Sequence, residues 1–186
     1  QGLSTDPRKI AAVQEWPIPR CVRDVRSFMG LAGYYRKFIY DFAGIAAPLH
    51  ALTKKHRRFV WDSACQVAFE ILKERLTSSP VLALPKDEGL YIIDTDASDF
   101  SIGSILSQVQ DSEEHVIAYH SRLYSKAEIN YCTTRKELLA VVDALRQFRP
   151  YVLGRHFIVR SDHSALQWIW RAKNLVGQQA RWLDLL

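Results

Sequence analysis

Three carboxylates stand at positions from which they could act together. Asp96 ends an apolar run, residues 90–96, that has the composition of a short strand, and Asp162 directly follows a second such run. Glu137 lies within a predicted helix, residues 133–148. Carboxylates are preferred ligands of Mg²⁺, and two such ions about 4 Å apart can hold the attacking and the leaving oxygen of a phosphodiester. The three residues are therefore candidate ligands of a two-metal site.

Glu137 is the most informative of the three, because it lies at the border of an apolar helix face. With about 100° between successive helical residues, the apolar side chains of residues 138–148 form one arc, and Glu137 lies at its edge. Asp143 and Lys136 lie on the opposite side, where we expect solvated charges. A carboxylate that faces a core margin is costly unless it is paired or bound to metal. The alternative is that it reaches solvent or pairs with Arg135 or Lys136.

The two strand-end carboxylates also have simpler interpretations. Asp96 precedes small and polar residues, so it is also typical of a turn. Asp162 precedes a predicted helix, where an aspartate commonly caps the first turn. The capping role is compatible with metal binding, so neither residue alone settles the chemistry.

The elements that must position these residues differ between the two halves of the chain. Residues 5–79 have helical periodicity, with a start at Thr5 or Asp6 and a capping box formed by Ser63 and Gln66. The later residues alternate as strands do, and the first three strands are close enough in sequence to form an antiparallel meander. The predicted strands are residues 90–96, 100–108, 115–121 and 155–161, and the predicted later helices are residues 133–148, 163–171 and 178–186.

Composition narrows the class of protein. The 186 residues are 48% hydrophobic and 24% charged, as in ordinary globular domains, and no apolar run approaches the roughly 20 residues that cross a bilayer. Residues 1–86 hold 14 Lys and Arg against 7 Asp and Glu, whereas residues 87–186 hold 11 against 13, so the net charge of +5 divides into +7 and −2. We therefore expect a nucleic-acid surface in the first half.

The three cysteines do not suggest a metal or redox pair. Cys21, Cys65 and Cys132 are far apart in sequence, and no two of them form a CxxC motif. We expect each of them to be a small apolar core residue in a reducing compartment.

Sequence strings along the whole chain resemble a known family. Three strings of the second half, TDASD (95–99), TRKELLAVV (134–142) and RSDHSAL (160–166), are similar to the ribonuclease H domain of gypsy-type (Ty3-like) LTR retrotransposon Pol polyproteins. The string VRSFMGLAGYYRKFI (25–39) resembles the reverse transcriptase thumb of the same polyproteins. The motifs occur in the matching order.

The resemblance implies a fold of the α/β class, α+β overall. A small helical thumb-like subdomain, residues 1–80, would precede a three-layer ribonuclease H-like domain with a mixed sheet, residues 81–186. In the family, this domain continues with a further strand and a last helix that carries a fourth acidic ligand. The 186 residues do not include these elements, so we expect this segment to be inactive by itself.

The resemblance also implies an activity. In the intact protein, a reverse transcriptase and ribonuclease H would hydrolyse the RNA strand of RNA–DNA hybrids with Mg²⁺, or Mn²⁺ in its place. Asp96, Glu137 and Asp162 match the family's first three metal ligands. The alternative is a non-catalytic nucleic-acid-binding module from a decayed or domesticated retroelement.

A second set of residues would bind the template–primer. Arg26, Gly30 and Tyr34 are spaced by four and share one helix face. In similar reverse transcriptases the matching positions line a track in the minor groove of the duplex. The alternative is that Gly30 packs against another helix and Tyr34 is a core aromatic. The basic run 54–58 is either a solvated loop or a phosphate contact.

The expected partners are the RNA–DNA hybrid, the template–primer and the remainder of the Pol polyprotein, with no membrane. The expected location is the cytoplasmic retroelement particle with nuclear access, and not the secretory route.

Overall fold

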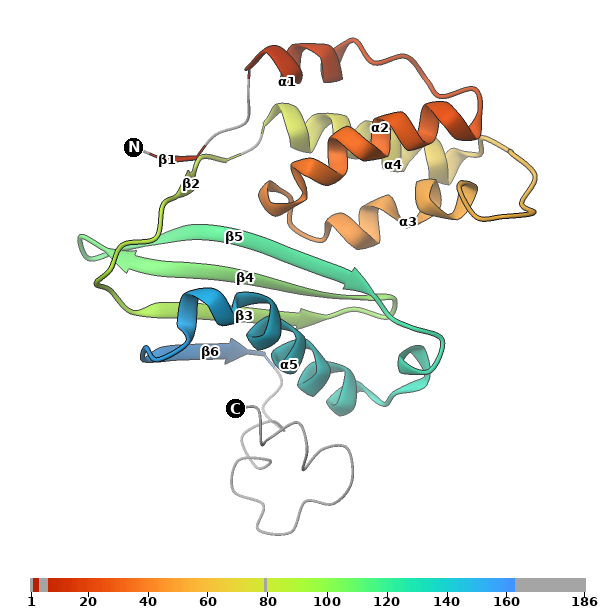
Figure 1. The fold of residues 1–186 in the computed structure, drawn as a ribbon. Helices are drawn as coiled ribbons and strands as arrows, with labels where there is room; N and C mark the ends of the chain where they lie inside the picture. Colours follow the sequence, from red (N-terminus) through yellow and green to blue (C-terminus); the bar gives the residue numbers. More distant parts are fainter. Residues whose placement is uncertain (1, 4–6, 79, 163–186) are drawn as a thin grey trace.

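Helices cover both faces of a central sheet. The structure is a computed structural model that describes residues 2–3, 7–78 and 80–162. Four helices form a layer on one face of the sheet, and one long helix, α5 (Thr133–Val152), crosses the other face (Figure 1). The four helices of the first layer are α1 (Pro7–Gln14), α2 (Val22–Tyr34), α3 (Phe42–Leu52) and α4 (Ser63–Thr77). The predicted combination of a helical part with a mixed sheet is confirmed.

The sheet has the strand order β5-β4-β3-β6. Its first three strands in sequence form the predicted antiparallel meander, and the fourth returns through α5 to lie parallel to β3. A return of this kind needs a crossover connection, which the 20 residues of α5 supply. The strands are β3 (Tyr91–Ala97), β4 (Ser101–Gln110), β5 (Glu113–Leu123) and β6 (Phe157–Ser161).

A short additional pairing and two 3₁₀ turns were not predicted. Strand β1 (Gly2–Leu3) pairs antiparallel with β2 (Leu82–Ala83), so the two ends of the helical layer are joined. The turns are η1 (Arg36–Phe38), which connects α2 to α3, and η2 (Glu128–Asn130), which precedes α5. Elements of two or three residues have too little periodicity to be read from sequence.

Two apolar clusters hold the layers together. One lies among the four helices, with Val25, Phe28 and Leu72 fully buried, and it extends to Tyr119 on β5. The other lies between α5 and the opposite face of the sheet, where Ile93 and Val142 are fully buried. Because residues of one strand alternate between the two faces, one sheet serves both clusters.

The N-cap of helix α4 lies one residue earlier than predicted. The carboxylate of Asp62 accepts a hydrogen bond from the backbone N–H of Cys65 at 2.8 Å, so Asp62 is the N-cap and the predicted capping box of Ser63 and Gln66 is wrong. The Gln66 side chain instead accepts from Nε1 of Trp61 at 2.7 Å. Asp caps as well as Ser does, and the two candidates are adjacent in sequence.

Helix α5 passes through Pro150, where the sequence indicated its end. Proline removes one backbone donor, but the loss falls in the last turn of the helix. Val152 is 5% exposed within the second apolar cluster, and the N–H of Leu153 donates to the carbonyl of Arg149 at 3.0 Å. Burial of Val152 therefore outweighs the missing bond.

The expectation for the cysteines is correct only for Cys65, which is buried. Cys21 and Cys132 are exposed, because they stand at the N-caps of α2 and α5 and not on an apolar face. The predicted cap at Thr5 or Asp6 and the helices predicted at 163–171 and 178–186 lie outside the described residues. Within the part of the chain that the structure describes, no helix combines the length and apolarity needed to cross a membrane.

Candidate active site and nucleic-acid interface

Two of the candidate carboxylates lie side by side at one end of the sheet. Strands β3 and β6 are parallel neighbours, and their register pairs Thr95 with Ser161. Asp96 and Asp162 are the next residue of each chain segment, and both are exposed. Parallel pairing thus brings together two carboxylates that are 66 positions apart in the sequence.

Glu137 occupies the second turn of α5 and is only 5% exposed. Its Oε2 atom is buried and has no hydrogen-bond partner among the residues that the structure describes. Lys136, one of its predicted alternative partners, instead donates from Nζ to the carbonyl of Asp99 at 3.3 Å and lies over the ring of Tyr124. The buried position at the edge of the apolar face agrees with the helical periodicity, and the orphaned oxygen marks a group that needs a ligand.

The electrostatics place the three carboxylates in one neighbourhood. Burial, together with the negative charges of Asp162 and Asp96, raises the pKa of Glu137 to about 7. Two carboxylates therefore lie close enough to repel the charge of a third. A cation bound between the three carboxylates would offset this repulsion.

The three candidate carboxylates have the chemistry that a hard divalent cation requires. Their side chains do not yet have the geometry of a metal-binding site. All three candidates supply carboxylate oxygens, the ligands that Mg²⁺ and Mn²⁺ prefer. Within residues 2–3, 7–78 and 80–162, no group of three or more His, Cys, Asp or Glu side chains is arranged to hold a metal ion. One oxygen of Asp96, Oδ2, accepts a hydrogen bond from the hydroxyl of Tyr40 at 2.9 Å.

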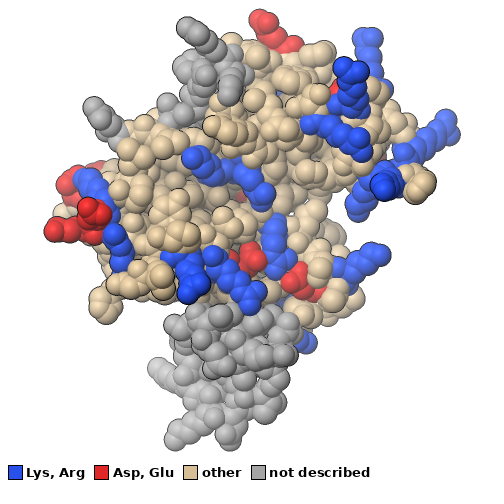
Figure 2. Space-filling view, viewed as in Figure 1, with Lys and Arg blue, Asp and Glu red and all other residues tan. Residues whose placement is uncertain are grey.

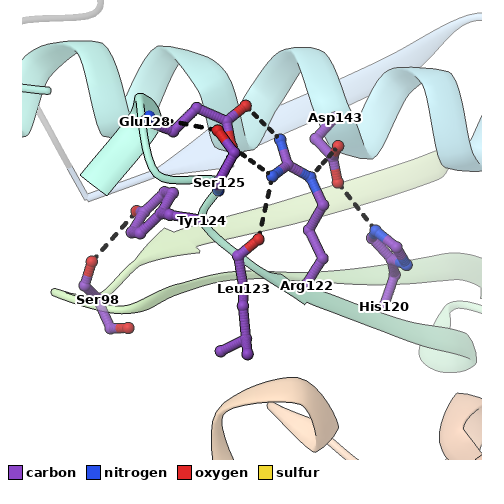
Figure 3. Close-up of polar contacts among 8 residues, drawn as sticks. All are labelled: Ser98, His120, Arg122, Leu123, Tyr124, Ser125, Glu128 and Asp143. Atoms are coloured by element: carbon purple, nitrogen blue, oxygen red, sulfur yellow. Dashed lines mark hydrogen bonds and ion pairs between the residues drawn. The ribbon is translucent and has the colours of Figure 1, made fainter. Parts of the chain in front are cut away.

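A network of ion pairs joins the helix that carries Glu137 to the sheet. Arg122 on β5 donates from Nε to Oδ1 of Asp143 on α5 at 2.7 Å, and its Nη1 donates to Oε2 of Glu128 at 2.9 Å (Figure 3). Nε2 of His120 lies 2.9 Å from the other oxygen of Asp143. The expectation that Asp143 is an ordinary solvated charge is wrong, because β5 presents both partners to that side of α5.

The network shifts the acidity of its carboxylates. Burial alone raises the pKa of Asp143, but the hydrogen bonds from His120 and Arg122 outweigh it, and the pKa lies below its usual range. The hydrogen bond from Arg122 likewise lowers the pKa of Glu128. Both carboxylates are therefore held in the charged form, and the ion pair of Asp143 with Arg122 joins α5 to β5.

The second candidate set lies on the exposed side of α2. Arg26 and Gly30 are exposed, and 72% of Tyr34 is accessible. A Cβ added to Gly30 would meet no atom within 4 Å. The alternative interpretation, with a packing glycine and a core tyrosine, is therefore wrong, and the face is open to a large partner.

The basic run 54–58 forms an exposed loop between α3 and α4. Nη2 of Arg26 donates to the carbonyl of Thr53 at 3.3 Å, which links this loop to the exposed face of α2. Figure 2 shows Lys and Arg side chains gathered at the right-hand end of the helical layer, where Figure 1 places this loop. The loop and the face of α2 thus form one basic surface.

Sequence reasoning missed two residues that contact the candidate site or its support. Tyr40 follows η1 and belongs to no periodic pattern or motif. Arg122 is a single charged residue within strand β5, so nothing in the sequence distinguishes it from other charged residues. Their partners, Asp96 and Asp143, are 56 and 21 residues away. Only the three-dimensional arrangement of the layers reveals such pairs.

Known relatives agree with the resemblance. The chain is 39% identical over 182 residues to the retrovirus-related Pol polyprotein from transposon 297 of Drosophila melanogaster, covering 97% of this chain and 17% of that protein. It is 37% identical over 194 residues to the corresponding polyprotein from transposon gypsy of the same organism, covering 97% and 18%. The chain thus spans less than a fifth of these relatives.

Solved structures share the fold. The foamy viral protease-reverse transcriptase dRH in complex with double-stranded DNA superposes with a TM-score of 0.83 and 22% identity, covering 98% of this chain and 33% of that one. The same viral enzyme in complex with an RNA/DNA hybrid gives a TM-score of 0.75 and 22% identity, covering 96% and 25%. At this level of identity the similarity establishes the fold alone.

A family model covers more than half of the sequence. Residues 61–159 match the model described as an RNase H-like domain found in reverse transcriptase. The matched segment begins before α4 and ends within β6, so it contains strands β3 to β5, helix α5, Asp96 and Glu137. The chain therefore belongs to the family of RNase H-like domains found in reverse transcriptases.

Proposed function

We propose that this chain is the template–primer-binding and nuclease segment of a retroelement reverse transcriptase, and that the intact protein hydrolyses the RNA strand of RNA–DNA hybrids. The proposal rests mainly on the environment of the Glu137 carboxylate. Its carboxylate is buried beside two others, its pKa is raised to about 7, and one of its oxygens has no hydrogen-bond partner within residues 2–3, 7–78 and 80–162. A bound cation would offset the burial and the repulsion that this carboxylate experiences, which supports a cation site here.

Asp96, Glu137 and Asp162 would hold Mg²⁺, or Mn²⁺ in its place. When bound, such ions lower the pKa of an attacking water and stabilise the charge that develops on the leaving oxygen. The protein's own part is to fix the three carboxylates. The ends of β3 and β6 set the spacing of the two aspartates, and the apolar face of α5 keeps Glu137 out of bulk water.

The helical layer would hold the duplex. On α2, Gly30 leaves room for a sugar–phosphate backbone, Tyr34 can lie against sugars, and Arg26 can reach phosphates or groove-edge acceptors. Two solved structures with this fold are complexes with double-stranded DNA and with an RNA/DNA hybrid. We extend that substrate class to this chain, together with the remainder of the polyprotein as its covalent partner.

The test uses the longer protein that contains this segment, with a labelled RNA–DNA hybrid and Mg²⁺. We expect cleavage of the RNA strand by the unchanged protein and its loss in Asp96→Asn, which keeps the size of the side chain and removes its charge. Asp99→Asn is the matched control, because this exposed aspartate lies three residues away in the turn after β3. Cleavage that persists undiminished in Asp96→Asn would overturn the site assignment.

A non-catalytic binding module predicts a different result. It would bind the hybrid with the affinity expected of the basic helical layer, yet the unchanged protein would leave the RNA strand intact in either metal. That outcome would reject the nuclease proposal in favour of the non-catalytic binding module.

A further inference from the structure

The helical layer contributes one side chain to the carboxylate site. Tyr40 lies in the connection between η1 and α3, and its hydroxyl donates to Oδ2 of Asp96 at 2.9 Å. Its ring contacts Tyr119 edge-on, with 6.3 Å between the ring centroids. A Cβ placed on Gly103 would lie 3.5 Å from Cε2 of Tyr40, so the ring lies against β4 at the position paired with Asp96.

The backbone around Tyr40 is fixed to the same end of the sheet. Asp41, in the left-handed region at φ 48°, accepts hydrogen bonds from the hydroxyl of Ser101 at 2.9 Å and from the N–H of Gly44 at 3.2 Å. Arg36 donates to the carbonyl of Ser121 at 2.7 Å, and the N–H of Ala43 donates to the Ser121 hydroxyl at 2.9 Å. Contacts on both sides of Tyr40 thus set the position of its hydroxyl.

Packing alone does not account for a tyrosine at this position. Tyr40 is 42% exposed, so it contributes less apolar burial than its neighbours Phe38 and Ile39, which are 4% and 2% exposed. The feature specific to a tyrosine is the hydroxyl, and it contacts a candidate metal ligand. Carboxylates that bind metals are commonly held by a hydrogen bond from a residue outside the ligand set, and removal of that residue typically costs about 10- to 100-fold in metal affinity or activity.

We infer that Tyr40 is a positioning residue, which orients the carboxylate of Asp96 for metal binding and thereby links the helical layer to the nuclease site. This inference rests on the proposed function of Asp96. The hydrogen bond from Tyr40 to Oδ2 would hold the carboxylate plane of Asp96 in one orientation. The helical layer would then serve the site in addition to holding the duplex.

The test compares Tyr40→Phe with the unchanged protein in the longer polypeptide that contains this segment. Calorimetric titration with Mn²⁺ and with Mg²⁺, in the absence of nucleic acid, measures metal affinity independently of turnover. We expect the dissociation constant of the metal to rise by about 10-fold or more in Tyr40→Phe. In hybrid cleavage, the Mg²⁺ concentration for half-maximal rate should rise by a similar factor, while the rate at saturating Mg²⁺ recovers to within about twofold of the unchanged protein.

Tyr119→Phe is the matched control. It removes another phenolic hydroxyl beside Tyr40 and keeps the ring that Tyr40 contacts. We expect Tyr119→Phe to bind both metals as the unchanged protein does. An equal loss of metal affinity in Tyr119→Phe and Tyr40→Phe would show a general loosening of the contact and overturn the positioning role.

The failure of this inference is distinguishable from the failure of the proposed function. If Asp96→Asn abolishes cleavage while Tyr40→Phe binds metal with unchanged affinity, only the role of Tyr40 is overturned. If Asp96→Asn cleaves normally, the site itself is misassigned, and the inference about Tyr40 falls with it. Thermal unfolding of Tyr40→Phe, compared with Tyr40→Leu, separates lost packing from the lost hydroxyl, because only the leucine variant removes the ring that contacts Tyr119.

Discussion

The Nε of Arg122 donates to Oδ1 of Asp143 at 2.7 Å, and this pair ties strand β5 to helix α5 six residues after Glu137. The rotation of α5 decides whether Glu137 faces the margin of the sheet or bulk water. An ion pair with 30% and 18% exposed side chains can fix that rotation more strongly than a solvated surface pair can. The support of the candidate site therefore extends beyond the three carboxylates.

Removal of Arg122 should destabilise the chain. In Arg122→Met, the carboxylates of Asp143 and Glu128 lose their shared cationic donor, and we expect the free energy of unfolding at pH 7 to fall by about 2 kcal/mol. Urea unfolding followed by circular dichroism measures the change. In Arg160→Met, which removes a 49% exposed partner of Asp94 and Glu114, we expect a loss of less than about 1 kcal/mol. Equal losses in the two variants would contradict a special role for the Arg122 network.

The stabilisation by this network should disappear in acid. The pKa values of Asp143 and Glu128 are lower in the folded chain than their ordinary values, so the folded chain holds these protons less tightly than the unfolded chain does. The resulting stability is present above the ordinary carboxylate range, about pH 4, and is lost as the pH falls through the lowered values. We expect the difference in stability between the unchanged chain and Arg122→Met to shrink from pH 7 to pH 3. Urea titrations at four pH values in that range would measure it, and a constant difference would count against the network.

The sequence predicts the order of the main elements, because their periodicity is local. The alternation along β3 and the helical arc of α5 place Asp96 and Glu137 on the correct elements, and the parallel return of β6 places Asp162 beside Asp96. The contacts that hold these residues in position, in contrast, join elements that are far apart in the sequence. Asp143 looks solvated on a helical wheel, because the wheel does not contain the β5 side chains that approach it. The contact of Tyr40 with Asp96 likewise depends on how two layers pack, which no local pattern encodes.

Neutralising Glu137 should stabilise the metal-free chain. With its pKa raised to about 7, Glu137 is largely ionised at pH 8 while it is buried and repelled by two carboxylates. We expect Glu137→Gln to raise the free energy of unfolding at pH 8 in EDTA by about 2 kcal/mol. Glu74→Gln, at an exposed position on α4, should change stability by less than about 0.5 kcal/mol.

The same pair of variants tests the metal site without turnover. Addition of Mg²⁺ should raise the unfolding midpoint of the unchanged chain more than that of Glu137→Gln, because a ligand that binds the folded state stabilises it. Thermal scans across a Mg²⁺ series provide the measurement. A Glu137→Gln variant that is less stable than the unchanged chain in EDTA would show that the carboxylate has a structural role.

The basic loop should contribute to nucleic-acid affinity in a salt-dependent manner. Each phosphate contact contributes about 0.9 to the slope of log affinity against log salt for duplex DNA. We expect the slope for a 20-base-pair RNA–DNA hybrid to become less steep by about 1 to 2 in Arg57→Gln/Arg58→Gln. Arg146→Gln/Arg149→Gln is the matched control, because it removes the same charge from exposed positions on α5, on the other face of the sheet. Equal changes of slope in the two double variants would show that only net charge matters.

Substitution of Gly30 on the exposed face of α2 should change stability and nucleic-acid affinity in opposite directions. An alanine there meets no atom within 4 Å and removes a helix-interior glycine, so Gly30→Ala should raise the free energy of unfolding by about 1 kcal/mol. If the face lies against the duplex, the added methyl group keeps the backbone of α2 away from the groove. We then expect a loss of roughly tenfold in hybrid affinity, equivalent to about 1.4 kcal/mol. Gel-shift titration at fixed salt measures it, with Gln147→Ala on α5 as an exposed helical control. A variant that is both more stable and undiminished in affinity would place the duplex elsewhere on the helical layer.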